Sequence, residues 1–487
     1  MKNFSIPFLI IFALVYQVNA QKFSVSFSPE VLKDNFSGNV ILYLSKENKS
    51  PKDISVGLEL TPVFRIEVEK LAGSQEVVFD DNAISYPVAL TDIERGKYYA
   101  QVVFDLNQGD FNIGSSAGNI YSIPVNVSLT KDFNQVFKIV ADKTIDPVVF
   151  KETGLLKELS VKSQLLSDFN KKDVFVNGAV ALPEDYFSNP EAKYPVVFSI
   201  FGFGANYKIH SGLGKYKFTH LNDQPVIVVY LDGNCPEGHS TYANSDVNGP
   251  WGDALVKEFI PALTKKYRTN GANLLFGHSS GGWSTLWLQI NYPKVFVGTW
   301  SSSPDQVDFR NYQNKNIYEE KNMFYDENGS LYFDVTIAGR LPVTSAKDFY
   351  RTEDVIYRGS QMHSFDAVFG GFDKDGKRIR LVKLPGGEIN PAALPLWKRY
   401  DISILLRQSW DQLKNDLNGK MRISVGEGDN FYLNHPVHLL ETEMKKLGAN
   451  IEFEYFAGDH FTVFTAEYQK KGLAFLEQCY ETWSASK

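Results

Sequence analysis

Hydrophobic and polar positions between Lys22 and about Val148 follow a strand-like pattern. Short segments rich in aromatic and β-branched residues alternate with turn-forming Gly, Asn, Asp and Pro, which is typical of β-strands joined by turns. We therefore predict a β-sandwich of roughly immunoglobulin type over residues 21–148. This region contains no His, so we expect no catalytic base from it. The predicted strands are Phe23–Phe27, Asn39–Tyr43, Ile66–Val68, Tyr98–Phe104 and Tyr121–Val127.

After Leu155 the pattern changes to that of a mixed α/β sheet. Glu158–Ser163 and Asp173–Leu182 read as two antiparallel edge strands. Apolar runs of buried-strand length follow, with helical periodicity between several of them, as in Ala254–Tyr267. This alternation predicts an α/β fold with helices on both faces of a parallel sheet. The apolar runs are Tyr194–Phe201, Pro225–Leu231, Asn273–Phe276 and Val295–Trp300.

The alternation stops at Asp308 and resumes near Gly419. The intervening text is charged and aromatic and ends in a predicted helix, Ile402–Leu417. We interpret residues of about 309–419 as an insertion that forms a lid or substrate-binding cap. The catalytic domain then spans 149–487. Its last predicted elements are the strand Met421–Gly426, a helix from Pro436 to Leu447, the strand Ile451–Phe456 and a helix from Thr465 to Trp483.

The first twenty residues have the features of a secretory signal peptide. Lys2 is followed by an apolar run from Ile6 to Tyr16 and by the small-residue cleavage site Val18-Asn19-Ala20. A membrane anchor is the alternative, but the apolar run is short for a membrane span. We therefore predict an exported protein, periplasmic or secreted, whose mature chain begins at Gln21.

Composition and charge narrow the classes of partner. The chain of 487 residues is 43% hydrophobic and 22% charged, with a formal net charge of -7 and no basic stripe. Nucleic acid is therefore not expected as a partner. After the leader, no segment is long and apolar enough to predict a membrane helix. The mild acidity says nothing about a small-molecule or carbohydrate ester, which would be recognised through local geometry. Cys235 and Cys479 are the two cysteines, and sequence spacing leaves their pairing open.

A candidate nucleophile lies in Gly277-His-Ser-Ser-Gly281, directly after a predicted buried strand and before a predicted helix. This is the context of a nucleophile elbow, in which a sharp strand-to-helix turn exposes the serine. Small residues two positions before and after Ser279 let the strand and helix approach each other. An idle serine in a glycine-rich turn is the alternative. The motif predicts the α/β-hydrolase version of the fold.

A serine nucleophile needs a base and an acid, and chain order selects His460 and Asp429. His460 follows the last predicted strand, and Asp429 follows the strand before it, which gives the order Ser, Asp, His of this fold. Glu427 and Asp459 are rival acids. We expect His278 to point away from the site and pack.

Two backbone amides are expected to stabilise the oxyanion of the tetrahedral intermediate. The first is that of Ser280, directly after the nucleophile, and the second is that of Phe203, with Gly204 behind it, at the end of the predicted strand Tyr194–Phe201. An ordinary flexible turn is the alternative for the second position.

Several stretches of the chain together match one known family. They are Tyr194-Pro-Val-Val followed by Gly202-Phe-Gly, Asn248-Gly-Pro-Trp-Gly252 before Glu258-Phe-Ile-Pro261, Gly277-His-Ser-Ser-Gly-Gly282 and Gly458-Asp-His460. On these residues, the chain from about Leu159 onward resembles the esterase-D-like, or putative esterase, family of α/β hydrolases. That family includes feruloyl and acetylxylan esterases, enterochelin esterases and mycolyltransferases. The resemblance implies ester hydrolysis through an acyl-enzyme without a cofactor. Two departures are Phe201-Gly202, where His-Gly is frequent, and the long insertion.

Three functions compete at this point. The leading prediction is an exported serine carboxylesterase that hydrolyses acyl esters, with carbohydrate esters among the candidate substrates. Acyl transfer or peptide cleavage by the same three residues is the second. The third is a catalytically inactive glycan-binding protein that uses its N-terminal sandwich.

Overall fold

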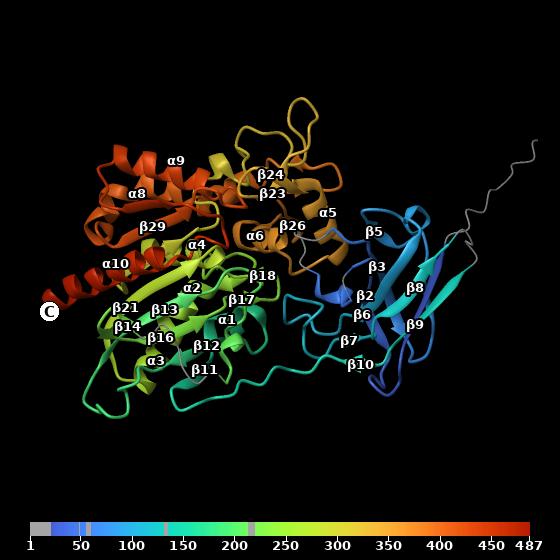
Figure 1. The fold of residues 1–487 in the computed structure, drawn as a ribbon, viewed down its shortest axis with the longest axis horizontal. Coiled ribbons are helices and arrows are strands. Elements are labelled where there is room, and N and C mark those ends of the chain that lie inside the picture. The colour runs from blue at the N-terminus through green and yellow to red at the C-terminus, as the bar shows by residue number, and fades with distance from the viewer. Residues whose placement is uncertain (1–20, 48, 55–59, 131–134, 213–219) are drawn as a thin grey trace, which may run out of the picture.

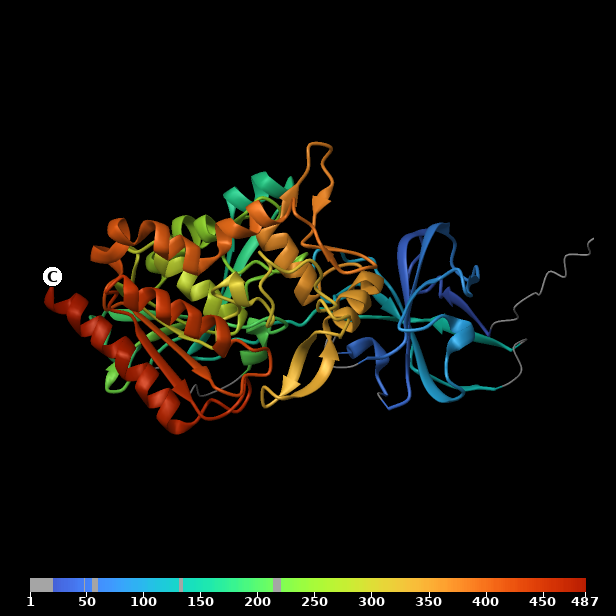
Figure 2. The same cartoon turned by 90° about the horizontal axis from the view of Figure 1, so that it is seen from above.

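The computed structural model describes residues 21–47, 49–54, 60–130, 135–212 and 220–487. The predicted signal peptide, residues 1–20, lies outside this range, so export stays a prediction. Two bodies are visible along the long axis of the molecule: a β-rich N-terminal part in blue and cyan, and a larger α/β part in green to red (Figures 1 and 2).

The N-terminal part is built from two sheets around one apolar core. A three-stranded sheet has the order β4-β1-β9, and a larger sheet has the order β10-β7-β6-β2-β3-β5, with β8 beside β6. Phe23 on the small sheet and Phe64 on the large one are both fully buried in this core, so the sheets form a sandwich. All pairs are antiparallel except β1 with β9. The strands are β1 (Lys22–Phe27), β2 (Phe36–Ser45), β3 (Val63–Leu71), β4 (Val77–Phe79), β5 (Ile84–Tyr86), β6 (Gly96–Phe104), β7 (Ile120–Tyr121), β8 (Val125–Leu129), β9 (Val136–Ala141) and β10 (Lys143–Thr144).

One strand prediction in this region was wrong. The segment Tyr121–Val127 belongs to two strands, β7 and β8. Both strands pair with β6, but at different places along it. Pro124 separates them, and proline cannot donate to a ladder. The chain reaches the next sheet between Thr144 and Leu156, and we propose the domain boundary near 148–149 in this connection.

The α/β part contains an eight-stranded sheet in the order β11-β12-β16-β13-β21-β22-β29-β30. β11 and β12 are antiparallel, as predicted, but only β11 lies at the edge, because β12 also pairs with β16. From β16 to β30 all neighbours are parallel. This is the α/β-hydrolase fold predicted from the elbow motif. The strands are β11 (Leu156–Lys162), β12 (Phe175–Ala181), β13 (Tyr194–Ile200), β16 (Ile227–Leu231), β21 (Thr269–His278), β22 (Phe296–Ser302), β29 (Met421–Gly426) and β30 (Glu452–Phe456).

Helices cover both faces of this sheet. On β21, Leu275 packs in the cluster that contains residues of α3, whereas its neighbour Leu274 packs in the cluster that contains residues of α10. The predicted helix Ala254–Tyr267 is interrupted by a π-helical turn, Leu255–Phe259. The helices outside the insertion are α1 (Gln164–Asn170), α2 (Trp251–Ala254), α3 (Ile260–Lys266), α4 (Ser280–Asn291), α9 (Asn434–Lys446) and α10 (Ala466–Ala485).

The chain between β22 and β29 corresponds to the predicted insertion. Its last helix, α8 (Ile402–Leu417), has the predicted bounds and packs against α4 and α9, because Leu406 and Trp410 join the same core as Trp283. Further short strands and helices precede α8 in this segment. They are β23 (Phe333–Ile337), β24 (Leu341–Ser345), α5 (Ala346–Ile356), α6 (Gln361–Phe369), β25 (Gly371–Phe372), β26 (Arg378–Ile379), β27 (Val382–Lys383), β28 (Glu388–Ile389) and α7 (Leu394–Trp397).

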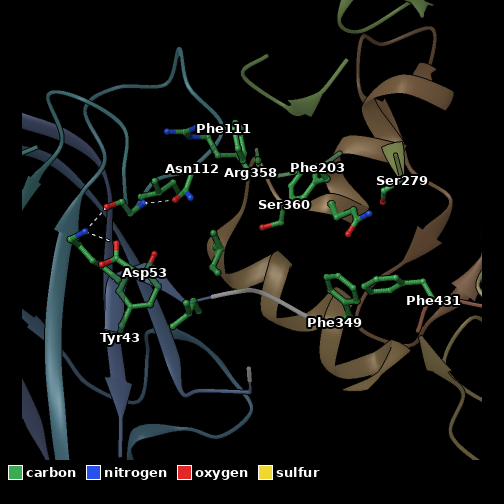
Figure 3. A pocket seen from close by; sticks show the side chains of 18 of the residues that line it. Tyr43, Asp53, Phe111, Asn112, Phe203, Ser279, Phe349, Arg358, Ser360 and Phe431 are labelled. Atoms are coloured by element: carbon green, nitrogen blue, oxygen red, sulfur yellow. Dashed lines mark hydrogen bonds and ion pairs between the residues drawn. The ribbon is translucent and has the colours of Figure 1, made fainter. Parts of the chain in front are cut away.

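The sandwich contacts this segment through α5, which packs on β3 and β5. Ile41 and Val63 of the sandwich share a small apolar core with Val355 and Ile356 of α5. A cleft between the two parts opens beside Ser279 (Figure 3). The sandwich is therefore a neighbour of the candidate site, although the sequence assigned it no chemistry.

Both cysteines are buried and free, so the pairing left open by the sequence is absent between Cys235 and Cys479. Across the described residues, helices long and apolar enough for a membrane span do not occur.

Candidate active site

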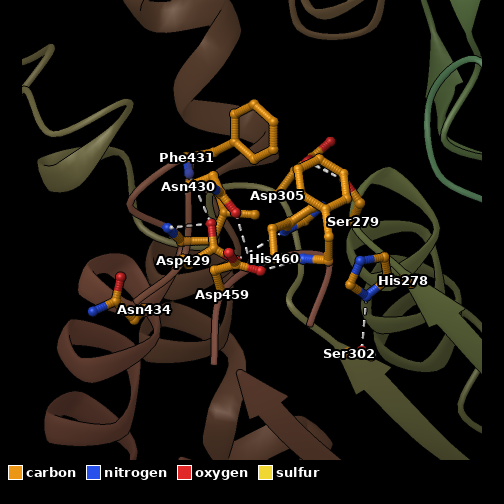
Figure 4. Close-up of polar contacts among 12 residues, drawn as sticks. His278, Ser279, Ser302, Asp305, Asp429, Asn430, Phe431, Asn434, Asp459 and His460 are labelled. Carbon is orange, nitrogen blue, oxygen red and sulfur yellow. Dashed lines mark hydrogen bonds and ion pairs between the residues drawn. The ribbon is translucent and has the colours of Figure 1, made fainter. Parts of the chain in front are cut away.

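The three predicted catalytic residues follow three strands of the parallel sheet. Ser279 comes directly after β21, Asp429 lies three residues beyond β29, and His460 lies four residues beyond β30. Parallel strands present their carboxyl ends at one edge of the sheet, so these residues come together there (Figure 4).

Ser279 has the strained backbone of a nucleophile elbow. Its φ of 59° and ψ of -125° are sparsely populated by any residue with a side chain. A Cβ on Gly277 would lie 2.2 Å from the carbonyl oxygen of Gly281, and a Cβ on Gly281 would lie 2.0 Å from that of Ile200. A side chain at either glycine would therefore clash with the neighbouring backbone. This is why the motif has small residues two positions before and two positions after the serine.

His460 and Asp429 are joined by a hydrogen bond of 2.8 Å between Nδ1 and Oδ2. Both side chains are buried. The other carboxylate oxygen, Oδ1, accepts the backbone N–H of Phe431 at 2.9 Å, which fixes the orientation of the carboxylate. With Nδ1–H donated to Asp429, the lone pair of Nε2 is left to act as a base.

The rival acids are engaged elsewhere. The Glu427 carboxylate lies 3.3 Å from Nε2 of His438 and is half exposed. The Asp459 carboxylate accepts hydrogen bonds from the backbone N–H of Phe461 at 3.0 Å and of Thr462 at 2.8 Å. The hydrogen-bond geometry therefore favours Asp429 as the acid that orients His460.

The Ser279 hydroxyl contacts a carboxylate that the sequence prediction did not include. Its Oγ donates to Oδ1 of Asp305 at 3.4 Å, and among the described hydrogen bonds none joins this Oγ to His460. Ser280 Oγ donates to the other oxygen of Asp305 at 2.5 Å. Asp305 follows β22, the strand beside β21, so its position after a neighbouring strand was the signal that could have identified it.

Burial raises the pKa of the Asp305 carboxyl. The carboxyl is 3% exposed, and burial raises its pKa from 3.8 to about 6. The hydrogen bonds from the two serines and the charge of His460 oppose this rise. A buried carboxylate beside the nucleophile costs stability when it is ionised, which is typical of a functional site.

Asp305→Asn is expected to gain stability relative to the parent as pH rises from 4 to 7. A carboxyl whose pKa is higher in the folded state contributes stability below its unfolded pKa and loses it as pH rises through about 6. Asparagine does not titrate, so the difference in Tm, variant minus parent, increases over this range. The change in the free energy of unfolding is a few kcal/mol at most, at about 1.4 kcal/mol per pKa unit. Thermal unfolding across this range checks it, and a constant difference contradicts the assignment.

The loop after β13, which carries the candidate second oxyanion donor, lies against the nucleophile. A Cβ on Gly202 would lie 3.1 Å from Cβ of Ser279, and Phe203 and Gly204 line the same cleft as Ser279. His239 holds this loop. Its Nδ1 accepts the backbone N–H of Thr241, so its Nε2–H donates to the Phe201 carbonyl at 3.0 Å. Burial lowers the pKa of His239 to about 4, which keeps it neutral.

His278 is part of the site, contrary to the expectation that it points away. Its ring centroid lies 4.4 Å from that of His460, and Nδ1 lies 2.8 Å from Oγ of Ser302 (Figure 4). Burial lowers the pKa of His278 well below its usual value, so an uncharged ring supports the candidate base.

Asn430 connects the loop of the base to the predicted insertion. Its Oδ1 accepts the backbone N–H of His460 at 3.0 Å, and its Nδ2–H donates to the Thr336 carbonyl on β23 at 2.8 Å. The insertion therefore helps to hold the base in place. Groups of three or more His, Cys, Asp or Glu side chains in a metal-binding arrangement are absent from the described residues.

Comparison with known proteins gives one family match. The model described as putative esterase matches residues 173–471. No curated protein matches the chain. A ferulic acid esterase structure aligns over 68% of this chain and 100% of its own, with a TM-score of 0.40 and 14% identity. An S-formylglutathione hydrolase from Agrobacterium tumefaciens aligns over 69% and 98%, with a TM-score of 0.37 and 15% identity. Porphyromonas gingivalis dipeptidyl peptidase 4 aligns over 91% and 48%, with a TM-score of 0.38 and 12% identity.

Proposed function

Since the chain belongs to the putative esterase family of α/β hydrolases, we propose that it is an exported serine carboxylesterase. Ser279 is the nucleophile, His460 the general base and acid, and Asp429 the residue that orients His460. The substrate is an acyl ester, attacked without a metal or an organic cofactor.

In the acylation step, the Ser279 hydroxyl turns from Asp305 to Nε2 of His460 and attacks the ester carbonyl carbon. Nε2 accepts the hydroxyl proton, and the Asp429 carboxylate stabilises the imidazolium that forms. The new oxyanion accepts hydrogen bonds from the backbone N–H groups of Ser280 and Phe203. The tetrahedral intermediate then breaks its bond to the alcohol oxygen, which leaves with the proton from Nε2.

In the deacylation step, water takes the place of the alcohol. Nε2 of His460 accepts a proton from water as its oxygen attacks the acyl-enzyme carbonyl. The second tetrahedral intermediate expels Ser279 Oγ, which regains its proton from Nε2. The products are a carboxylic acid, an alcohol and the free enzyme.

The observation that supports this proposal most is the buried hydrogen bond of 2.8 Å between Nδ1 of His460 and Oδ2 of Asp429. It lies at the same sheet edge as a serine with an elbow backbone, φ 59°. A base oriented by an acid beside a strained, cleft-lining serine is the arrangement that nucleophilic catalysis requires.

The mature chain, residues 21–487, is expected to hydrolyse p-nitrophenyl acetate and to take up one fluorophosphonate group per chain. The reason is that a serine activated by a neighbouring base reacts with both. Nitrophenol release and intact mass measure the two reactions. A chain that does neither contradicts the proposal. Preferential acylation of added glycerol over water assigns acyl transfer instead, and equal turnover of the matching p-nitroanilide assigns peptide cleavage.

A further inference from the structure

The cleft beside Ser279 and His460 is closed on its far side by the N-terminal sandwich. It has a volume of ≈ 350 Å³, within the range for small organic ligands. Figure 3 shows Tyr43, Asp53 and Phe111 of the sandwich on one side and Ser279 on the other. A substrate that fills this cleft therefore contacts two parts of the chain that are far apart in sequence.

Buried polar contacts hold these two walls at a fixed separation. The Arg358 guanidinium donates to both carboxylate oxygens of Asp105, at 2.6 and 2.8 Å, and to the carbonyl of Asn107 at 2.7 Å. A Cβ on Gly359 would lie 1.8 Å from the carbonyl oxygen of Phe111, so glycine is needed for this close approach. The cleft is therefore preformed, which reduces the entropy cost of binding.

Aromatic rings surround the end of the cleft near the nucleophile. Phe111 of the sandwich and Phe203 of the candidate oxyanion loop lie 5.5 Å apart, centroid to centroid, across the domain boundary. Phe431 and Phe461 form a second pair at 6.1 Å beside His460. Phe349 of α5 also lines the cleft. These phenylalanine rings favour a ligand with an aromatic ring, because aromatic rings pack favourably against one another.

Charged side chains in the lining are neutralised by neighbours. Lys52 Nζ lies 2.6 Å from the Asp53 carboxylate and donates to the Gly114 carbonyl at 2.9 Å. Arg358 is paired with Asp105. A charged substrate would have to displace these partners, whereas Ser360 and Gln361 offer uncharged polar groups. The electrostatics therefore favour an uncharged substrate.

We propose that the cleft binds an uncharged ester with an aryl group, and that Phe111 of the sandwich selects for it by contact. The aryl group lies among Phe111, Phe203 and Phe349, and the ester carbonyl lies at Ser279. The N-terminal sandwich is thus a determinant of substrate selectivity. This inference rests on the proposed esterase function for its kinetic test.

The test compares three esters by pH-stat titration: ethyl acetate, ethyl 3-phenylpropanoate and 2-phenylethyl acetate. The parent is expected to prefer one aryl ester over ethyl acetate in kcat/KM, and the preferred ester tells whether the acyl or the alcohol half carries the aryl group. Phe111→Ala is expected to lower this preference at least about tenfold, equivalent to roughly 1.4 kcal/mol of transition-state binding.

Two further variants separate selectivity from folding. Phe111→Leu keeps an apolar side chain in the core and is expected to lose part of the preference at an unchanged Tm. Phe187→Ala removes an exposed phenylalanine, 63% exposed and outside the cleft lining, and is expected to keep the parental preference. A preference that stays parental in both Phe111 variants overturns the proposal.

Binding of 4-phenylbutan-2-one, an uncharged ketone that cannot be hydrolysed, separates the inference from the proposed function. Calorimetry is expected to show binding to the parent and at least about tenfold weaker binding to Phe111→Ala. Binding without ester hydrolysis would refute the esterase and support the site. Ester hydrolysis with no aryl preference and no ketone binding would refute the site and leave the esterase.

Discussion

Ser279→Ala is expected to lower kcat for p-nitrophenyl acetate by about 10⁴- to 10⁶-fold, to the residual level that oxyanion stabilisation and binding provide. The reason is geometric as well as chemical. Alanine removes the Oγ that forms the acyl-enzyme, and the neighbouring Ser280 has its Oγ bonded to Asp305 at 2.5 Å in the interior. Ser279 itself has the elbow backbone, φ 59°. Stopped-flow and single-turnover assays measure the loss.

Ser280→Ala is the matched control for this change. It removes the adjacent hydroxyl but keeps the backbone N–H proposed for the oxyanion, so the chain is expected to keep its fluorophosphonate label at residue 279. Mass spectrometry of the labelled peptide identifies the modified serine. A label retained in Ser279→Ala would show that another residue is the nucleophile.

Asp429→Asn is expected to lower kcat by about 10⁴-fold at neutral pH while the fold is kept. The Nδ1–H of His460 now donates to the Asp429 carboxylate at 2.8 Å. An asparagine amide that presents its NH₂ group to Nδ1 would favour the other tautomer, with the proton on Nε2, where it cannot accept the serine proton. Steady-state kinetics on p-nitrophenyl acetate provides the measurement.

The rival acids supply the controls for the acid assignment. Asp459→Asn changes an acid next to His460 in sequence whose carboxylate accepts backbone N–H groups of its own loop. Glu427→Gln changes one that is paired with His438. Each is expected to reduce kcat by less than about tenfold. A loss in Asp459→Asn that equals the loss in Asp429→Asn would reassign the acid.

Local patterns predicted most elements of the fold. The helix Ile402–Leu417 and the strand Met421–Gly426 have the predicted bounds because their apolar periodicity, Asp401 cap and Gly426 end are local signals. The π-helical turn Leu255–Phe259 could not be predicted in this way. The apolar residues keep helical spacing on both sides of the turn, so the sequence does not mark it.

The candidate site shows the same division. Ser279, Asp429 and His460 were predicted from motif and strand order, and a hydrogen bond joins the last two. Asp305 was missed because its contact with Ser279 is made by a neighbouring strand end rather than by a motif. The contact between the sandwich and the insertion was not predicted because Asp105 and Arg358 are separated by 253 residues, and charge alone does not reveal such a pair.

The buried pair of Asp105 and Arg358 also bears on how this chain can be divided. The Arg358 side chain is 9% exposed and that of Asp105 is fully enclosed, so removal of the sandwich would take away the partner of this guanidinium. It would also expose Val355 and Ile356 of α5, which share an apolar core with Ile41 and Val63 of the sandwich. Exposure of a buried valine or isoleucine costs about 1.5–3 kcal/mol for each side chain, a large fraction of the stability of an ordinary domain. The sandwich is thus no detachable module. Unfolding of either part exposes the apolar residues that the two parts share. The chain is therefore expected to unfold as one cooperative unit, and truncation or engineering has to treat it as one.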